Sequence, residues 1–484
     1  MNLSFESNNG TGREIVPTSA HCFQSEATEG AFPLSPAQAR MFLQSLSAPN
    51  AGVYLEQIIC RADGELDSPA FEKAWQHVVD CNDILKTSYR SEGLDEPHQV
   101  VEQDVTFPFQ QYEWRGLSKA EQENRLECLI REDRAAGFDF SKAPLARLAL
   151  IRVKDDSYLF IWSLHSSILD GWSQALVLKQ VFTTYKALAR GEEPQVSFSC
   201  PYRDYIDWSH AQDLTEAEEF WTRTLKGFTS PTSLGDDQLA KSSQSEGISY
   251  EDLELWLTTE ETDRLQSFAR QNRLTRFTLV AGAWALLLGC YSGSDDVVYG
   301  TTVSVRPPEL ENMESTPGPF VNTIPVRVRL SFAGEIISWL KELQIEAVEE
   351  REYQHTPLVL IQSWSEVARD LELFNSILVF QNFPIEEDLY DMGDRVCVRR
   401  LRWILCRTHY PLALLAMPGP ELGFRFVYDG KRFERDAIQR MLEHLRTILE
   451  EIVTGPTRKL AHFRPVGKRY NNRGAARRVN VAHN

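Results

Sequence analysis

Stretches with the apolar spacing of helices and stretches with that of strands alternate along this chain, and the alternation occurs twice. In the first half, helices are predicted at 68–80, 118–135 and 171–189, and strands at 84–89, 145–153 and 158–164. In the second half, helices are predicted at 259–271, 276–291, 336–351 and 435–453, and strands at 296–303, 321–330, 376–380 and 423–428. Sheets in such a chain bury their faces under helices, so the pattern predicts an α/β fold.

The same pattern sets the expected domain boundaries. Residues 229–247 are rich in Ser, Gly, Asp, Gln and Pro, which indicates a linker between two halves at 32–228 and 248–464. Residues 1–31 lack periodicity and are expected to form a flexible leader. Residues 465–484 contain basic side chains and no acid, and are expected to form a disordered tail.

Charge and hydropathy exclude several classes of function. The net charge of −18 argues against a nucleic-acid partner, because binding to phosphates relies on Lys and Arg. The longest apolar stretch, 279–290, is well short of the ~20 residues that span a bilayer, and no signal-peptide pattern is present, so we expect a cytoplasmic protein without a membrane partner. No glycine-rich phosphate loop and no cluster with metal-ligand spacing occurs, which predicts neither a nucleotide cofactor nor a metal.

One segment, residues 162–173, concentrates polar groups. An apolar strand is predicted to end in His165 and Ser166, and Asp170-Gly171 then turns into a helix. Strand ends and helix starts are where α/β folds place reactive groups. Taken alone, the pattern favours a satisfied core histidine and an aspartate that caps the helix, by roughly three to one over a catalytic site.

Taken with its neighbours, this segment resembles the active-site motif His-His-x-x-x-Asp-Gly of condensation domains from nonribosomal peptide synthetases. Further stretches resemble other motifs of that family in the same order. They lie at 35–41, 82–87, 202–208, 291–293, 296–300, 303–307, 318–327, 373–382 and 410–412. The resemblance extends over about 32–453, nearly all of the chain that is expected to be ordered.

The resemblance implies two chloramphenicol-acetyltransferase-like halves that form a V-shaped pseudo-dimer with a central channel. Donor and acceptor would enter the channel on the phosphopantetheine arms of carrier proteins, without a bound cofactor. We expect an acyl or peptidyl carrier protein domain that acts in trans, or a small-molecule acyl donor and acceptor. No adenylation or carrier motif is present, so we expect a freestanding or excised domain, and a monomer.

The sequence departs from the family motif at one position. His165 matches the first histidine, but Ser166 replaces the second, which in the family is taken to orient or deprotonate the attacking amine. An imidazole accepts a proton near pH 7, whereas a serine hydroxyl needs help to do so. Three interpretations stay open. In the first, condensation is driven by positioning, and Ser166 forms a hydrogen bond to the nucleophile or to the tetrahedral oxyanion. In the second, Ser166 is a covalent nucleophile activated by His165, which the alternation of side chains along a strand disfavours. In the third, the domain catalyses a different reaction or only binds.

The resemblance also implies roles for residues around the motif. Asp170 is expected to pair with Arg306 of the second half and to pin the motif loop there. The Gly171 N–H is expected to face a developing oxyanion at a helix N-terminus. The residues expected to bind substrate along the channel are Ser173, Asn322 and His355. Asn322 could equally brace the second half, and His355 could act from behind the channel wall.

These observations predict an enzyme that joins a thioester-activated acyl or peptidyl group to an amine or hydroxyl, with His165, Ser166, Asp170 and Gly171 in the catalytic site. The alternative is a remodelled domain that cyclises, dehydrates or rearranges a bound intermediate, or that only binds a carrier-tethered substrate. Acyl transfer from coenzyme A is a third class, and the condensation-specific motifs argue against it.

Overall fold

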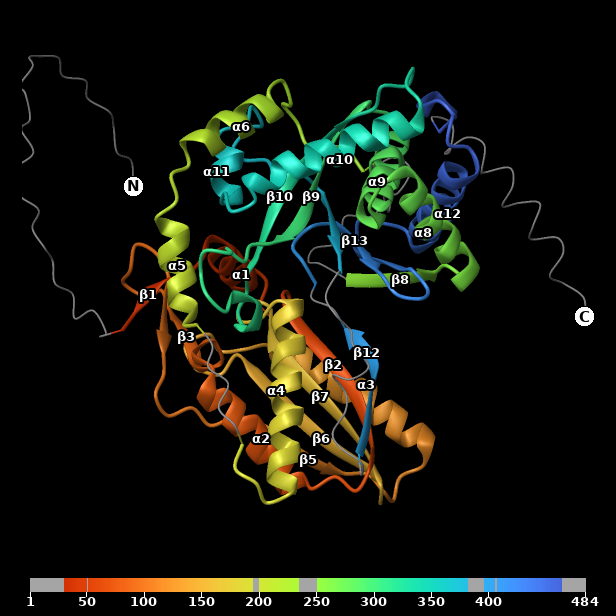
Figure 1. Cartoon of the computed structure of the whole chain (residues 1–484). Helices are drawn as coiled ribbons and strands as arrows, with labels where there is room; N and C mark the ends of the chain where they lie inside the picture. Colours follow the sequence, from red (N-terminus) through yellow and green to blue (C-terminus); the bar gives the residue numbers. More distant parts are fainter. Residues whose placement is uncertain are drawn as a thin grey trace, which may run out of the picture.

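The computed structural model describes residues 30–49, 51–194, 200–234, 250–381, 396–404 and 407–463. These residues form two lobes, each of which contains a sheet covered by helices (Figure 1). The predicted α/β class is confirmed. Nearly all of the predicted leader and the whole predicted tail lie outside the described residues.

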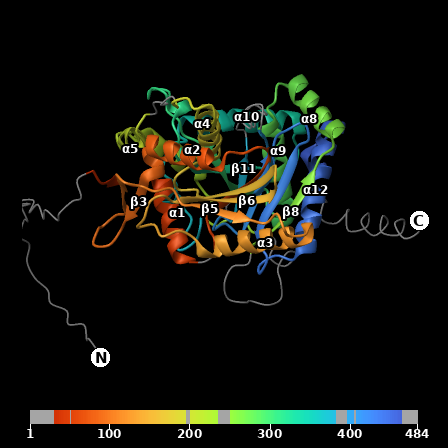
Figure 2. The same ribbon diagram turned by 90° about the horizontal axis from the view of Figure 1, so that it is seen from below.

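The first lobe is a five-stranded sheet with helices on both faces (Figure 2). In spatial order its strands are β12 (Val396–Ile404), β2 (Leu55–Gly64), β7 (Ser157–His165), β6 (Ala146–Lys154) and β5 (Phe109–Glu113). Its helices are α2 (Ser68–Cys81) and α4 (Gly171–Ala189) on one face and α3 (Lys119–Ala136) on the other. Because side chains alternate along a strand, Ile58 and Cys60 of β2 pack toward α2 and α4, whereas Ile59 packs toward α3.

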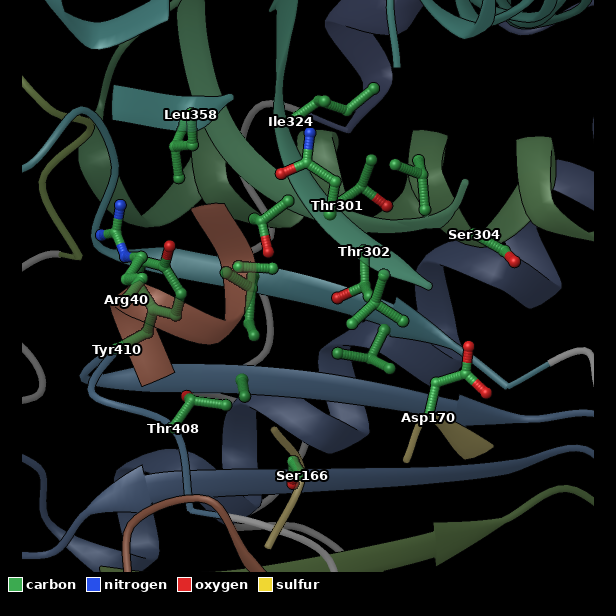
Figure 3. Close-up of a pocket in the computed structure, with 18 of the residues that line it drawn as sticks. Arg40, Ser166, Asp170, Thr301, Thr302, Ser304, Ile324, Leu358, Thr408 and Tyr410 are labelled. Atoms are coloured by element: carbon green, nitrogen blue, oxygen red, sulfur yellow. The ribbon is translucent and has the colours of Figure 1, made fainter. Parts of the chain in front are cut away.

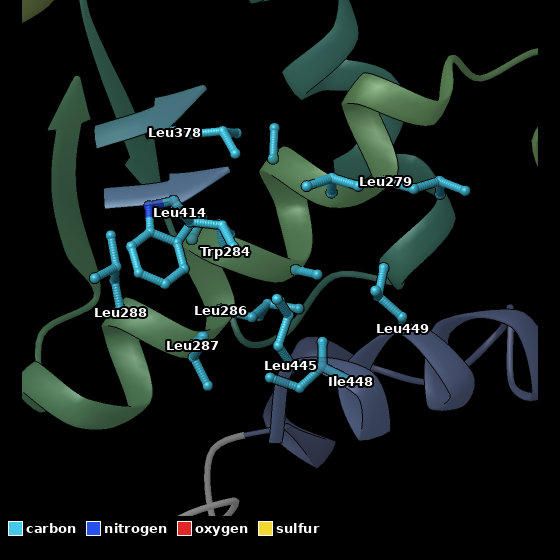
Figure 4. Close-up of a cluster of buried hydrophobic side chains, with 14 of the residues drawn as sticks. Leu279, Trp284, Leu286, Leu287, Leu288, Leu378, Leu414, Leu445, Ile448 and Leu449 are labelled. Atoms are coloured by element: carbon cyan, nitrogen blue, oxygen red, sulfur yellow. The ribbon is translucent and has the colours of Figure 1, made fainter. Parts of the chain in front are cut away.

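The second lobe contains a six-stranded sheet. In spatial order its strands are β10 (Val321–Arg329), β9 (Asp296–Ser304), β11 (Ser376–Phe380), β13 (Leu412–Met417), β14 (Gly423–Asp429) and β8 (Tyr250–Trp256). Its helices include α8 (Thr259–Asn272), α9 (Arg276–Ser292), α10 (Ile336–Glu352) and α12 (Arg435–Thr454). The core centres on Trp284 of α9, which packs against strand residues such as Leu414 and, with its neighbours, against α12 residues such as Leu445 (Figure 4).

Two elements cross between the lobes. Strand β12 follows β11 in the chain but pairs antiparallel with β2, so that a strand of the predicted second half completes the sheet of the first lobe. Helix α6 (Thr215–Leu225) belongs to the predicted first half, but Phe220 and Trp221 are buried in the second lobe beside Leu358 and Phe374. The predicted boundaries therefore do not separate the two lobes in space, because backbone pairing and apolar burial carry both segments across.

The predicted linker is also partly packed. Thr232 is buried and its hydroxyl accepts a hydrogen bond from the backbone N–H of Val298 at 2.7 Å, and Leu234 joins the core of the second lobe. Residues 235–247 lie outside the described residues. The described part of the linker is thus a fixed piece of the second lobe.

The predicted strand at 84–89 is wrong in its first half. Residues Asp83–Lys86 form a 3-10 turn, and strand β3 covers only Thr87–Arg90, in a small sheet with β4 (His98–Val101) and β1 (Phe32–Pro33). Ile84 and Leu85 are both buried, and a short apolar run fits a buried turn as well as a strand.

Among the residues that the structure describes, no single helix has the length and apolar character to cross a membrane. Helices α8 and α9 meet these criteria only as a pair, with a bend of 104° between them.

Gly300 sets how closely β9 approaches the loop before β11. A Cβ atom at Gly300 would lie 2.3 Å from Phe374 and 2.9 Å from Ile377, both of which are buried. We expect Gly300→Ala to lower the free energy of unfolding by about 1–3 kcal/mol through overpacking. The matched change Gly334→Ala meets nothing closer than 3.5 Å and is expected to have little effect. Urea denaturation of both variants tests this, and equal midpoints would contradict it.

Candidate active site

A cavity of about 1240 Å³ lies between the lobes and is lined by both (Figure 3). The first lobe contributes residues that include Arg40 of α1 (Pro36–Ser47), Ser166 and Asp170, and the second contributes residues that include Thr301 and Tyr410. Ser166 and Asp170 follow directly on β7, and Thr301 lies on β9. The structure thus places the end of the motif strand opposite the second sheet.

The cavity exists where the second sheet opens. Strand β11 pairs with β13 along its whole length but with β9 only at Ile377↔Gly300 and Leu378↔Thr301. Beyond these pairs the two strands diverge, and the diverging ends, 302–304 and 379–380, line the cavity. The opening therefore gives the cavity access to both faces of the sheet.

His165 lies at the end of β7, is 2% exposed and does not line the cavity. Its Nδ1 accepts from the backbone N–H of Ser167, which places the ring hydrogen on Nε2, 3.0 Å from the Ser45 hydroxyl. Burial lowers the pKa of His165 to about 3, so the ring is neutral at pH 7. Both ring nitrogens are occupied, and the residue ties α1 to the motif.

Ser166 points the other way and lines the cavity. Its hydroxyl donates to the Glu56 carboxyl, with Oγ and Oε1 2.8 Å apart, and has the Tyr54 carbonyl as a second acceptor at 3.0 Å. The other carboxyl oxygen of Glu56 accepts from Gln174 Nε2 at 3.0 Å. Glu56 is 6% exposed and also lines the cavity, so a hydroxyl and a carboxyl form one hydrogen-bonded pair on the cavity wall.

The pair can move a proton. The lone pairs of Ser166 Oγ can accept an N–H from a nucleophile while the hydroxyl hydrogen is directed at Glu56, and a positioned carboxylate is a competent general base. Glu56 is absent from the residues predicted for the site, because β2 was not among the predicted strands. The antiparallel register of β2 and β7 pairs Glu56 with Leu164 and Leu55 with His165. No local sequence pattern indicates this register.

Asp170 and Arg306 form an ion pair at 3.3 Å, with side chains 4% and 11% exposed. Asp170 caps α4 by accepting from the Ser173 N–H at 2.7 Å, and its second oxygen accepts from the Phe320 N–H at 3.1 Å. Arg306 also donates to the Thr316 carbonyl at 2.9 Å and stacks 4.2 Å from the centre of the Phe320 ring. This network fixes the motif loop against the segment between β9 and β10, whose Val305 and Phe320 are buried in the core of the first lobe.

The other expected site residues take different places. Gly171 begins α4 and lines the cavity. Ser173 is fully buried, donates to the Gly318 carbonyl at 2.7 Å and does not line the cavity. Asn322 lines the cavity, but its amide donates to the carbonyls of residues 354 and 356, so it braces the wall. His355 does not line the cavity and contacts the ring of Trp208.

A second polar group on the cavity wall joins the lobes. Arg40 pairs with Glu372 at 2.8 Å and donates to Nε2 of His409, which leaves the His409 hydrogen on Nδ1, 2.6 Å from the Tyr54 hydroxyl. Burial, together with Arg40, lowers the pKa of His409 to about 3. In the sequence, Arg40 is singled out only as part of the stretch at 35–41 that resembles a family motif. Among the described residues, no group of acidic, His and Cys side chains could hold a metal ion.

Comparison with known proteins places this geometry in a family. The condensation-domain family model matches residues 28–471. The chain is 40% identical over 448 residues to part of a linear gramicidin synthase of Brevibacillus parabrevis, a match that covers 92% of this chain and 6% of that synthase polypeptide. It is 30% identical over 439 residues to bacitracin synthase 3 of Bacillus licheniformis, covering 90% of this chain and 7% of the relative. The chain thus spans a small part of these curated relatives.

Solved structures share the fold. A starter condensation domain of rhizomide synthetase in complex with C8-CoA has a TM-score of 0.76 and 18% identity, and the match covers 89% of this chain and 97% of that one. The X-domain from teicoplanin biosynthesis has a TM-score of 0.74 and 20% identity, over 89% of this chain and 96% of that one.

Removal of one partner tests how much the Asp170–Arg306 ion pair contributes to the stability of the fold. Arg306→Ala leaves the Asp170 charge buried without its cation, so we expect a loss of about 3–5 kcal/mol in the free energy of unfolding. The control is Arg115→Ala, which removes an arginine from an exposed ion pair with Asp155 and is expected to shift the urea midpoint little. Equal midpoints for the two variants would contradict the assignment.

The buried histidines predict acid lability. Because His165 titrates at about 3 when folded and near 6.5 when unfolded, the unfolded chain binds more protons between these values, and stability falls as pH drops from 6.5 toward 3. At pH 5 the titration of one such histidine lowers the free energy of unfolding by about 2 kcal/mol relative to pH 7. We expect His165→Gln to reduce the loss of stability between pH 7 and pH 5 by about that amount, measured by urea denaturation at both values. The exposed change His210→Gln serves as the control, and an identical decline in both variants would refute the prediction.

Proposed function

The chain belongs to the condensation-domain family of nonribosomal peptide synthesis, and from this premise we propose that it joins a thioester-activated acyl or peptidyl group to an amine inside the cavity. The observation that carries the proposal is the hydrogen bond from Ser166 Oγ to Glu56 Oε1 on the cavity wall. This pair takes over the proton transfer that the resemblance assigns to the family's second histidine. In this proposal, Ser166 in place of the family's second histidine changes which group acts as the base, and the reaction is still amide formation.

The proposed reaction balances as follows. The amine nitrogen attacks the thioester carbonyl carbon, and one of its protons passes to Ser166 Oγ while the hydroxyl proton of Ser166 passes to Glu56. The tetrahedral intermediate collapses with cleavage of the C–S bond, and the proton on Glu56 returns through Ser166 to the leaving thiolate. The first turn of α4 at Gly171 faces the same cavity and supplies backbone N–H groups for the oxyanion.

The substrates are proposed to arrive on the phosphopantetheine arms of carrier proteins acting in trans, with small-molecule donors and acceptors as the alternative. Support comes from apolar side chains exposed at the cavity mouth. Leu43 of α1 is 56% exposed and Val359 of α11 (Leu358–Ser363) is 66% exposed, and both line the cavity. Exposed apolar side chains at a cavity mouth fit a protein that must dock there transiently. We further propose that the domain acts as a cytoplasmic monomer.

A second candidate function rests on the same position. Because Ser166 has no imidazole, the scaffold could have exchanged condensation for cyclisation, dehydration or rearrangement of a bound intermediate, or for binding alone. The two candidates predict opposite effects of restoring a histidine at this position.

The pair is tested by Ser166→Ala and Glu56→Gln, assayed by mass spectrometry with an acyl-loaded carrier protein and an amine acceptor. Each change removes one member of the relay, so we expect each to lower the rate of amide formation by ~10²–10⁴, and the double variant to be no slower than the worse single one. Ser304→Ala removes another cavity-lining hydroxyl and is the control. Unchanged turnover in both single variants would refute the relay.

Ser166→His separates the two candidate functions. A faster amide-forming reaction is expected if the native chemistry is condensation, because an imidazole then supplies a base near neutral pH. Loss of a different native product, without gain of amide, would overturn condensation in favour of the second candidate.

A further inference from the structure

The lining of the cavity extends from Ser166 and Glu56 to helices α9 and α10 of the second lobe, and we call this part of the cavity the branch. The opening between β9 and β11 leads there, and the cavity lining includes Phe277 of α9 and Glu350 of α10. Helices α9 and α10 pack closely, since a Cβ atom at Gly282 would meet Leu340 at 2.5 Å. The branch thus lies where these two helices meet the ends of β9 and β11.

Glu350 is a buried carboxylic acid in this branch that the proposed reaction does not use. It is 6% exposed, and the described residues offer its carboxyl neither a hydrogen-bond donor nor an ion-pair partner. Burial, reinforced by Glu346 and Glu349, raises its pKa well above the ordinary value. Because no described group of the protein satisfies this carboxyl and it lies on a cavity wall, it is available to a partner that enters the cavity.

Aromatic side chains lie near Glu350 and elsewhere on the wall of the same cavity. Tyr299 is close enough to interact electrostatically with Glu350, and its hydroxyl lies 3.4 Å from the Ala281 carbonyl on α9. Phe277 precedes Ala281 by one helical turn, and its ring makes an edge-to-face contact with Phe380 at 5.8 Å between centroids. Both phenylalanines line the cavity. The cavity wall thus includes one carboxyl on α10 and an aromatic pair on α9 and β11.

Other charged groups near the branch do not satisfy the carboxyl. Arg276 at the start of α9 and Arg351 beside Glu350 line the cavity, but neither forms an ion pair with Glu350 in the described structure. Glu346 and Glu349 lie on the same helix and add negative charge. The local field at Glu350 thus favours a cation from outside the chain.

We propose that this branch binds a basic side chain of the substrate, an ammonium or guanidinium on an aliphatic stem, with Glu350 as the partner of the cation. The aliphatic stem packs along Phe277 and Phe380, and the cation gains from the aromatic faces as well as from the carboxyl. Burial favours the protonated form of Glu350 in the empty branch and a cation favours the ionised form, so that binding is accompanied by release of a proton to solvent. As the site of a substrate side chain the branch rests on the proposed function, but the binding itself does not depend on catalysis.

Isothermal titration calorimetry of the whole chain tests the proposal with Nα-acetyl-L-lysinamide and its uncharged analogue Nα-acetyl-L-norleucinamide. We expect the lysine compound to bind with a Kd lower by about tenfold or more, because a hydrogen bond to a charged group is gained. Repeating the titration at pH 7 in buffers of different ionisation enthalpy is expected to show release of about one proton for the lysine compound only.

Two variants assign the effect to Glu350. Glu350→Gln is expected to abolish both the tenfold preference and the proton release, whereas Glu349→Gln, an exposed neighbour on the same helix, is expected to keep both. The proposal is overturned if wild-type protein binds the two compounds equally. It is also overturned if Glu349→Gln loses the preference for the lysine compound while Glu350→Gln keeps it.

The same titration in Ser166→Ala separates this proposal from the proposed function. If the lysine preference persists while neither this variant nor wild type forms amide, the condensation proposal fails and the binding branch stands. If wild type forms amide from uncharged acceptors and donors but shows no lysine preference in binding, the branch proposal fails and condensation stands.

Discussion

The relation between the two lobes depends on the ion pair between Asp170 and Arg306. Both side chains are nearly excluded from solvent, so each charge needs the other, and neither can move away without a large electrostatic cost. Asp170 also caps α4 and accepts from the backbone of Phe320, which couples the start of a helix in one lobe to a loop in the other. The ion pair acts together with β12, with α6 and with the Arg40–Glu372 pair to hold the two sides of the cavity opposite each other.

The alternation of side chains at the end of β7 decides which motif residue is available for chemistry. His165 turns into the protein, where Ser167 and Ser45 occupy both ring nitrogens and burial keeps the ring neutral. Ser166 turns to the cavity, and its only side-chain acceptor among the described residues is Glu56. The surviving histidine therefore does not face the cavity, and in the proposed reaction the base lies on a neighbouring strand. Strand β2 supplies it because its register places Glu56 beside the end of β7.

The sequence predicts the α/β class and most helices, because amphipathic periodicity is local. Helix α4 begins and ends where its pattern indicates, at Gly171 and at residue 189. The motif order also leads to the neighbourhood of Ser166, Asp170 and Arg306. The sequence does not predict contacts between residues that lie far apart in the chain. Strand β12 pairs with a strand more than 300 positions earlier, and Glu56 accepts a hydrogen bond from Ser166, 110 positions away. Ser173 illustrates the same limit. Its hydroxyl donates to the Gly318 carbonyl and accepts from Arg306, so it is not available to bind a substrate.

One irregularity in the second sheet links the reaction site to the proposed recognition site. If β9 and β11 paired along their full length, as β11 and β13 do, the sheet would separate the catalytic cavity from the helices α9 and α10. Because pairing stops after two residues, the same cavity is lined by the diverging ends of both strands and by residues of α9 and α10. In the proposed reaction the polar relay acts on the atoms that form the new bond, and the proposed branch contacts a substrate side chain. Under these two proposals a change at Glu350 alters which substrate binds and leaves the bond that forms unchanged.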